Sequence, residues 1–123
     1  MERIFILKQT TNNKIQLSEN KEFWNNLKNN NSSIVYKIYC NYLKNSNETF
    51  DIIFGIDILN SKEIFLTIPR LTYQIFVSNT KNISKSWEKI QQLENNKIIK
   101  RSYIFDYEKY YPNGEVHIFL GIK

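Results

Sequence analysis

The chain has 123 residues, a formal net charge of +5, 41% hydrophobic residues and 15% aromatic residues. This length suits one domain and is too short for two, and the composition excludes a disordered chain. The lysines are scattered singly, which is not typical of a nucleic-acid-binding surface. No stretch approaches the roughly 20 apolar residues of a membrane span. One cysteine and one histidine exclude an internal disulfide and a cysteine-rich metal site. We therefore expect one cytoplasmic domain over residues 1–123, with no cofactor, no metal, no membrane contact and no direct nucleic-acid contact.

The first half of the chain predicts a strand, a helix and a hairpin. Residues 2–9 are rich in β-branched and aromatic side chains, which is typical of a strand. A helix is expected over 18–30, with Ser18 as its N-cap. Residues 34–43 and 49–58 alternate between apolar and polar and are separated by a short polar turn, so they predict an antiparallel hairpin.

The second half repeats this pattern. Segments rich in apolar and aromatic residues predict strands at 63–68, 72–78, 101–110 and 114–123. A helix is expected over 83–94, where Asn82 or Ser84 can supply the cap. The sequence therefore predicts an α+β fold of two β-α-β-β repeats, about 1–60 and 61–123. We expect them to be related by pseudo-twofold symmetry, with an antiparallel sheet and two helices around a central cleft.

Two carboxylates stand among aromatic residues near the end of the chain. Asp106 and Glu108 alternate with Tyr107, so both lie on one face of their strand. The aromatic residues on the other face are expected to point to the core, which leaves the carboxylates facing water or a cleft. Because Asp and Glu are seldom buried without a partner, the residues alone favour water for both.

Several short motifs occur in a fixed order along the chain. They are Phe54-Gly55-Ile56, Ile68-Pro69 followed by Tyr73 and Phe76, Ser86-Trp87-Glu88-Lys89-Ile90, Tyr107-Glu108-Lys109-Tyr110, and the last strand Val116–Lys123. In these motifs the sequence resembles the GyrI-like effector-binding domains, which are also attached to AraC-type and MerR-type multidrug-responsive regulators. The resemblance runs from Phe23 to Lys123 and is greatest to free-standing members, including the integron-cassette type.

The resemblance implies a binding site for small molecules. In the family, the glutamate of the aromatic-Glu-x-Tyr motif points into the cleft and pairs with cationic, lipophilic ligands, a role that falls to Glu108, while Asp106 keeps its solvent-facing interpretation. Side chains expected to line the same cleft come from both repeats: Tyr110, Phe119, Trp87, Tyr36, Phe54 and Trp24. Because no helix-turn-helix segment is apparent, a role in transcription regulation would need a separate regulator.

Two alternatives stay open at this point. Some GyrI-like relatives hydrolyse reactive electrophilic compounds, which would make Glu108 a general base beside Tyr110. Others act on DNA gyrase, which would make the domain a module that binds gyrase or a regulator. The main hypothesis is a protein that senses or sequesters cationic or aromatic small molecules and is not an enzyme.

Overall fold

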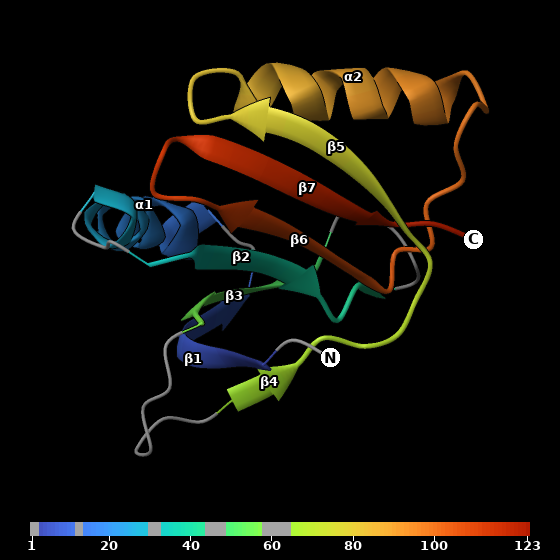
Figure 1. Cartoon of the computed structure of the whole chain (residues 1–123). Coiled ribbons are helices and arrows are strands. Elements are labelled where there is room, and N and C mark those ends of the chain that lie inside the picture. Colours follow the sequence, from blue (N-terminus) through green and yellow to red (C-terminus); the bar gives the residue numbers. More distant parts are fainter. Residues whose placement is uncertain (1–2, 12–13, 30–32, 44–48, 58–64) are drawn as a thin grey trace.

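The computed structural model describes residues 3–11, 14–29, 33–43, 49–57 and 65–123. Within these residues the chain forms two helices and one antiparallel sheet of seven strands (Figure 1). In chain order the elements are β1 (Arg3–Thr11), α1 (Lys14–Asn29), β2 (Val35–Cys40), β3 (Asp51–Ile56), β4 (Phe65–Thr67), β5 (Tyr73–Asn79), α2 (Ile83–Asn95), β6 (Phe105–Tyr110) and β7 (Glu115–Gly121). The predicted α+β class, with an antiparallel sheet and two helices, is confirmed.

The strands lie in the order β4-β1-β3-β2-β6-β7-β5. The predicted hairpin is present as β2 and β3, and β2 also pairs with β6, which joins the first half of the chain to the second. β4 pairs with β1 at the edge of the sheet. β4 was expected to be the first strand of the second repeat, but it pairs with a strand of the first repeat. The second strand-helix-strand-strand unit therefore begins at β5. Residue 58 of the strand predicted over 49–58, and residues 63 and 64 of the strand predicted over 63–68, lie outside the described residues.

The helix boundaries differ from the prediction at one end. α1 begins at Lys14, so Ser18 lies inside the helix, and its expected role as the N-cap was wrong. Lys, Gln and Leu are good helix formers, so the residues before Ser18 continue the helix instead of breaking it. α2 was predicted to within one residue, but its N-cap Asn82 makes no side-chain capping bond. The side chain of Asn79 instead accepts hydrogen bonds from the N–H groups of Lys81 and Asn82.

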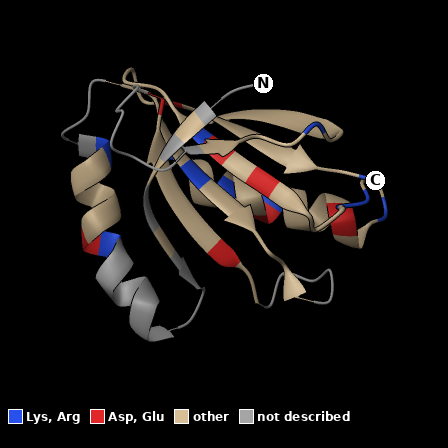
Figure 2. Ribbon diagram, turned by 90° about the horizontal axis from the view of Figure 1, so that it is seen from below, with Lys and Arg blue, Asp and Glu red and all other residues tan. Residues whose placement is uncertain are grey.

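Both helices cover one face of the sheet, which we call the helix face. Trp24 of α1 packs with Phe54 and Val116, and Ile90 of α2 packs with Ile118 and Leu120. On β7, Val116, Ile118 and Leu120 are alternate residues and therefore share one face. α1 and α2 lie at separate places along the sheet (Figures 1 and 2).

The other face of the sheet also carries a buried cluster. Its buried members come from β1, β2, β3, β6 and the segment between β4 and β5, and partly buried Phe119 of β7 packs against them; the buried members include Ile4, Tyr36, Ile38, Ile53, Ile68 and Tyr107. β6, an interior strand next to the central strand β2, is thus covered on both faces, and five of its six residues are buried. Among the described residues, neither helix is long and apolar enough to cross a membrane.

Candidate functional site

Glu108 lies in the middle of β6 on the helix face and is 2% exposed. Its Oε2 accepts a hydrogen bond from the indole N–H of Trp87 at 2.5 Å, and its Oε1 accepts one from the Tyr110 hydroxyl at 2.9 Å. The hydroxyl of Tyr39 is a further hydrogen-bonding partner. These donors come from α2, β6 and β2, and they replace the water that a buried carboxylate loses. The interpretation of the residues alone, which favoured water, is therefore overturned for Glu108.

The tyrosines around Glu108 are held in their protonated form. Burial, and then the charge of Glu108, raise the pKa of Tyr39 well above its ordinary value. Burial and Glu108 likewise raise the pKa of Tyr110. A neutral hydroxyl can donate to the carboxylate, whereas a phenolate would repel it, so the effect of Glu108 adds to that of burial.

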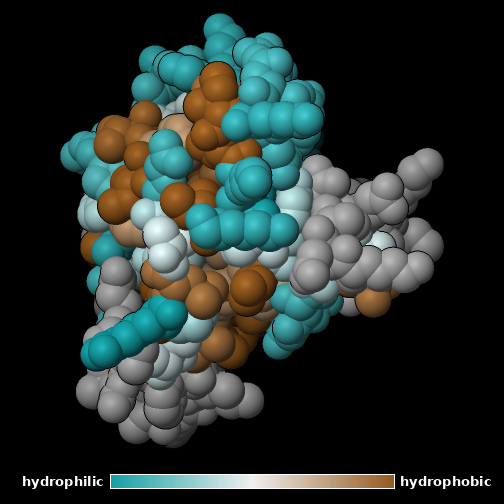
Figure 3. Space-filling view, turned by 90° about the vertical axis from the view of Figure 1, so that its right-hand side faces the viewer, coloured by the Kyte–Doolittle hydropathy of each residue, from teal (hydrophilic) through white to brown (hydrophobic). Residues whose placement is uncertain are grey.

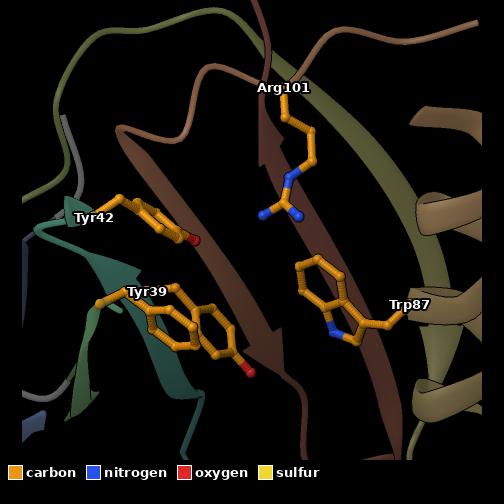
Figure 4. A pocket seen from close by; sticks show the side chains of 5 residues that line it. Tyr39, Tyr42, Trp87 and Arg101 are labelled. Carbon is orange, nitrogen blue, oxygen red and sulfur yellow. The ribbon is translucent and has the colours of Figure 1, made fainter. Parts of the chain in front are cut away.

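Two pockets lie on either side of the Glu108 donors. The first, the Arg101 pocket, has a volume of about 230 Å³ and is lined by Tyr39, Tyr42, Phe50, Trp87 and Arg101 (Figure 4). The second, the Lys28 pocket, has a volume of about 240 Å³ and is lined by Lys28, Ser33, Val35, Thr80, Tyr110, Tyr111, Pro112 and Gly114. Trp87 lines the first pocket and Tyr110 lines the second, so each pocket is lined by one of the hydrogen-bond donors of Glu108.

The Arg101 pocket is walled by aromatic rings. Tyr39 makes edge contacts with Trp87 and with Phe50, each at 5.7 Å between ring centroids. Trp87 lies on one side of the pocket and Tyr39 and Tyr42 on the other, with the guanidinium of Arg101 at one end (Figure 4). That guanidinium also lies over the Trp87 ring, at 5.6 Å from its centroid. The aromatic lining of this pocket suits the apolar faces of an aromatic ligand.

Exposed apolar side chains stand at the same end of the sheet. Leu43 follows β2, and Ile98 and Ile104 belong to the segment between α2 and β6; all three are more than half exposed. On this side of the molecule, apolar surface lies among polar surface (Figure 3). Leu43 is next to Tyr42, and Ile104 is next to Tyr103, whose ring contacts Tyr42 at 5.7 Å. The neighbourhood of the Arg101 pocket is therefore suited to a lipophilic molecule.

Asp106 is fully buried, which corrects its predicted place in solvent. It accepts hydrogen bonds from Arg101 Nη2 at 2.9 Å, from the backbone N–H of Gly121 at 2.7 Å and from the Tyr42 hydroxyl. Burial lowers the pKa of the Arg101 guanidinium, but the groups around it, Asp106 first among them, together raise this pKa by more. The pKa of Arg101 therefore lies above its ordinary value. The sequence prediction missed this pair because Arg101 comes from the segment before β6, which folds back to meet Ile122.

The structure separates the other predicted site residues into two groups. Trp24 and Phe54 lie on the helix face, stacked on each other at 5.2 Å, and Trp24 contacts Tyr110 edge-on at 4.8 Å. Tyr36 and Phe119 lie on the opposite face, where both stack on Tyr107. Tyr36 and Phe119 therefore lie on the face of the sheet opposite Glu108. A ligand-binding role of Trp24, Phe54, Tyr36 or Phe119 stays a prediction.

Several residues at the site were not predicted. They are Tyr39, Tyr42, Phe50 and Arg101 in the Arg101 pocket, and Lys28 and Lys37 beside Glu108. For Tyr39 the sequence did contain a signal, because alternation along β2 places Tyr39 on the face opposite Tyr36. It could not show which of these two faces holds Glu108, since that depends on the register between β2 and β6.

The fold and site define an α+β domain in which an interior strand carries a buried carboxylate whose hydrogen-bond donors line two pockets. No family model matches the chain, and no curated protein matches it. Among solved structures, the chain is similar to the integron cassette protein VCH_CASS2 from the mobile metagenome of Vibrio cholerae, with a TM-score of 0.69 and 23% sequence identity over 98% of this chain and 88% of that one. At this identity the similarity shows a shared fold.

Proposed function

We propose that this protein binds small, cationic aromatic molecules on the helix face and acts as an effector-binding or sequestering module of the GyrI-like type. The observation that carries the proposal is Glu108, a buried carboxylate whose hydrogen-bond donors Trp87 and Tyr110 each line a pocket. In this interpretation the two strand-helix-strand-strand units are related by pseudo-twofold symmetry, and the cleft lies between their helices. The family motifs around Trp87 and Tyr110 support the same assignment.

Glu108 and the aromatic rings around it favour a cationic group in the ligand. A positive charge over a ring face gains about 0.5 to 2 kcal/mol, depending on how far it is desolvated. The Arg101 pocket offers four rings, and Glu108 would supply a full negative charge where water is excluded. Because rings accept many planar molecules, we expect a broad range of ligands.

Ligand entry is expected to require movement of Trp87. Each pocket is smaller than the roughly 300 Å³ at the lower end of ordinary ligand sites. If the Trp87 side chain turned aside, its hydrogen bond to Glu108 would open, and the Arg101 pocket, which Trp87 lines, would widen toward the carboxylate. The cationic group of the ligand would then take the place of the indole N–H.

The proposal can be tested by titrating a cationic aromatic dye while following tryptophan fluorescence. The chain has two tryptophans, and Trp87 lies in the pocket wall, so binding should change the emission. Glu108→Gln removes the charge with little change in shape, and we expect it to weaken binding at least about tenfold, or about 1.4 kcal/mol. Glu88→Gln, at an exposed position of the same helix as Trp87, is the matched control and should bind as the wild type does.

A folded Glu108→Gln variant with wild-type affinity would refute charge pairing as the mechanism. The circular dichroism spectrum and thermal unfolding of each variant show whether it is folded. The hydrolase alternative, with Glu108 as base beside Tyr110, would be favoured by turnover of a reactive electrophile that Glu108→Gln abolishes. The alternative of a gyrase- or regulator-binding module would be favoured by a protein retained in a pull-down that still binds Glu108→Gln.

A further inference from the structure

Two lysines stand directly beside Glu108. Lys37 is its cross-strand partner in the register of β2 and β6, so both side chains lie on the helix face. The Lys37 ammonium lies 5.6 Å from the ring centroids of both Trp24 and Tyr39. Lys28, from α1, lies 5.3 Å from the Trp24 centroid and 5.7 Å from that of Tyr110.

The two ammonium groups therefore contact the same rings that surround Glu108. Tyr39 and Tyr110 both hydrogen-bond to the Glu108 carboxylate, and each also has a lysine over its ring. Both lysines also share the Trp24 ring. Lys37 and Lys28 are thus part of the site and not remote surface charges.

This arrangement gives the site a surplus of positive charge. Glu108 contributes one negative charge and Lys28 and Lys37 two positive charges, while the neighbouring Asp106 is neutralised by Arg101 at 2.9 Å. Burial and the charge of Lys37 lower the pKa of Lys28, against the opposing effect of Glu108. A ligand that is only cationic would add a further positive charge next to both lysines, at a cost that grows as water is excluded.

We propose that the ligands of this site are aromatic zwitterions, whose cationic group pairs with Glu108 and whose anionic group pairs with Lys28 and Lys37. This proposal rests on the function proposed above and names its ligand class. The aromatic body would occupy the Arg101 pocket, and the anionic group would lie toward the Lys28 pocket, which Lys28 lines. A carboxylate there would find two ammonium partners, and charge-assisted hydrogen bonds are about twice as strong as neutral ones. Lys37 is then a residue that determines specificity.

Three dyes with one xanthene core but different charge test this proposal. They are a rhodamine ethyl ester, which is a cation, the free acid of the same rhodamine, which is a zwitterion, and fluorescein, which is an anion at mildly alkaline pH. We expect the free acid to bind at least about tenfold more tightly than the ester, or about 1.4 kcal/mol, and more tightly than fluorescein. Dissociation constants are measured by fluorescence anisotropy at one pH and one ionic strength.

Lys37→Met and Lys28→Met remove a charge while keeping an unbranched side chain. Each is expected to reduce the preference for the free acid over the ester by about fivefold or more, chiefly by weakening binding of the free acid. Lys21→Met, at an exposed position of α1, is the matched control and should leave the preference unchanged. Circular dichroism and thermal unfolding of each variant show whether the protein is still folded, and Lys28→Met serves as the second variant if Lys37→Met is not.

The outcomes separate this inference from the proposed function. If the ester binds as tightly as the free acid, or if a folded Lys37→Met or Lys28→Met keeps the wild-type preference, the zwitterion proposal is refuted while cation binding at Glu108 stands. If fluorescein binds most tightly, the lysines alone hold the ligand, and the zwitterion proposal is likewise refuted. If none of the three dyes binds, both proposals fail.

Discussion

Replacing Asp106 by Asn is expected to remove a large part of the stability of this protein. The substitution keeps the shape of the side chain but leaves the guanidinium of Arg101, which is 7% exposed, without its negative partner. Removing one member of a buried ion pair costs about 3 to 5 kcal/mol, because the remaining charge stays desolvated. Domains of this size are stable by only about 5 to 15 kcal/mol. The variant should therefore lose between about a fifth and all of its free energy of unfolding.

Urea unfolding at neutral pH, followed by tryptophan fluorescence, measures this loss. With a slope of about 1 to 3 kcal/mol per molar urea, the midpoint should fall by about 2 M. Asp57→Asn, at an exposed position, is the matched control and should change the free energy of unfolding by less than about 0.5 kcal/mol. A loss of less than about 1 kcal/mol in Asp106→Asn would contradict the reasoning.

A double variant separates the unpaired charge from other losses. Arg101→Met in the Asp106→Asn background removes the desolvated charge, while the Asn oxygen can still accept the backbone N–H of Gly121. We expect the double variant to be more stable than Asp106→Asn alone, because replacing both members of a buried pair is often close to neutral. If it is no more stable, the cost does not come from Arg101, and the lost bond from Tyr42 becomes the better explanation.

Two further predictions concern alkaline pH and the last strand. The pKa values of Tyr39 and Tyr110 are raised above 10 in the folded state. The stabilising effect of the two protonated tyrosines is therefore complete below about pH 10 and is lost as the pH rises further. The loss is up to about 1.4 kcal/mol per pH unit for each tyrosine. Urea unfolding from roughly pH 8 to pH 11 measures this effect, and a free energy of unfolding that does not fall would contradict it. Gly121→Ala would place a Cβ atom 2.5 Å from the carbonyl oxygen of Phe105 and is expected to cost about 1 to 3 kcal/mol, and an unchanged thermal unfolding midpoint would count against this packing.

Local patterns in the sequence predicted most of the secondary structure. Alternation predicted the hairpin that became β2 and β3, and the helix expected over 83–94 is present as α2. Such patterns are visible because each strand or helix buries one side whatever its neighbours are. The motif resemblance also selected Glu108 over Asp106 as the carboxylate of interest, although alternation placed both on the same face.

The start of α1 and the place of β4 were not predictable in the same way. Ser18 is a favourable N-cap residue, yet the good helix formers before it continue the helix. The short β4 pairs with β1, far away in the chain, and nothing in its own residues specifies that partner. Capping and strand pairing both depend on competition between alternatives that the local sequence does not rank.

The composition of the site was decided by the tertiary structure. The sequence determined which side chains share a face within each strand, because successive residues of a strand point to opposite sides. It did not determine how the faces of different strands correspond, which depends on register and on where the helices lie. That correspondence placed Lys37 beside Glu108, moved Tyr36 and Phe119 to the opposite face, and buried Asp106 against Arg101.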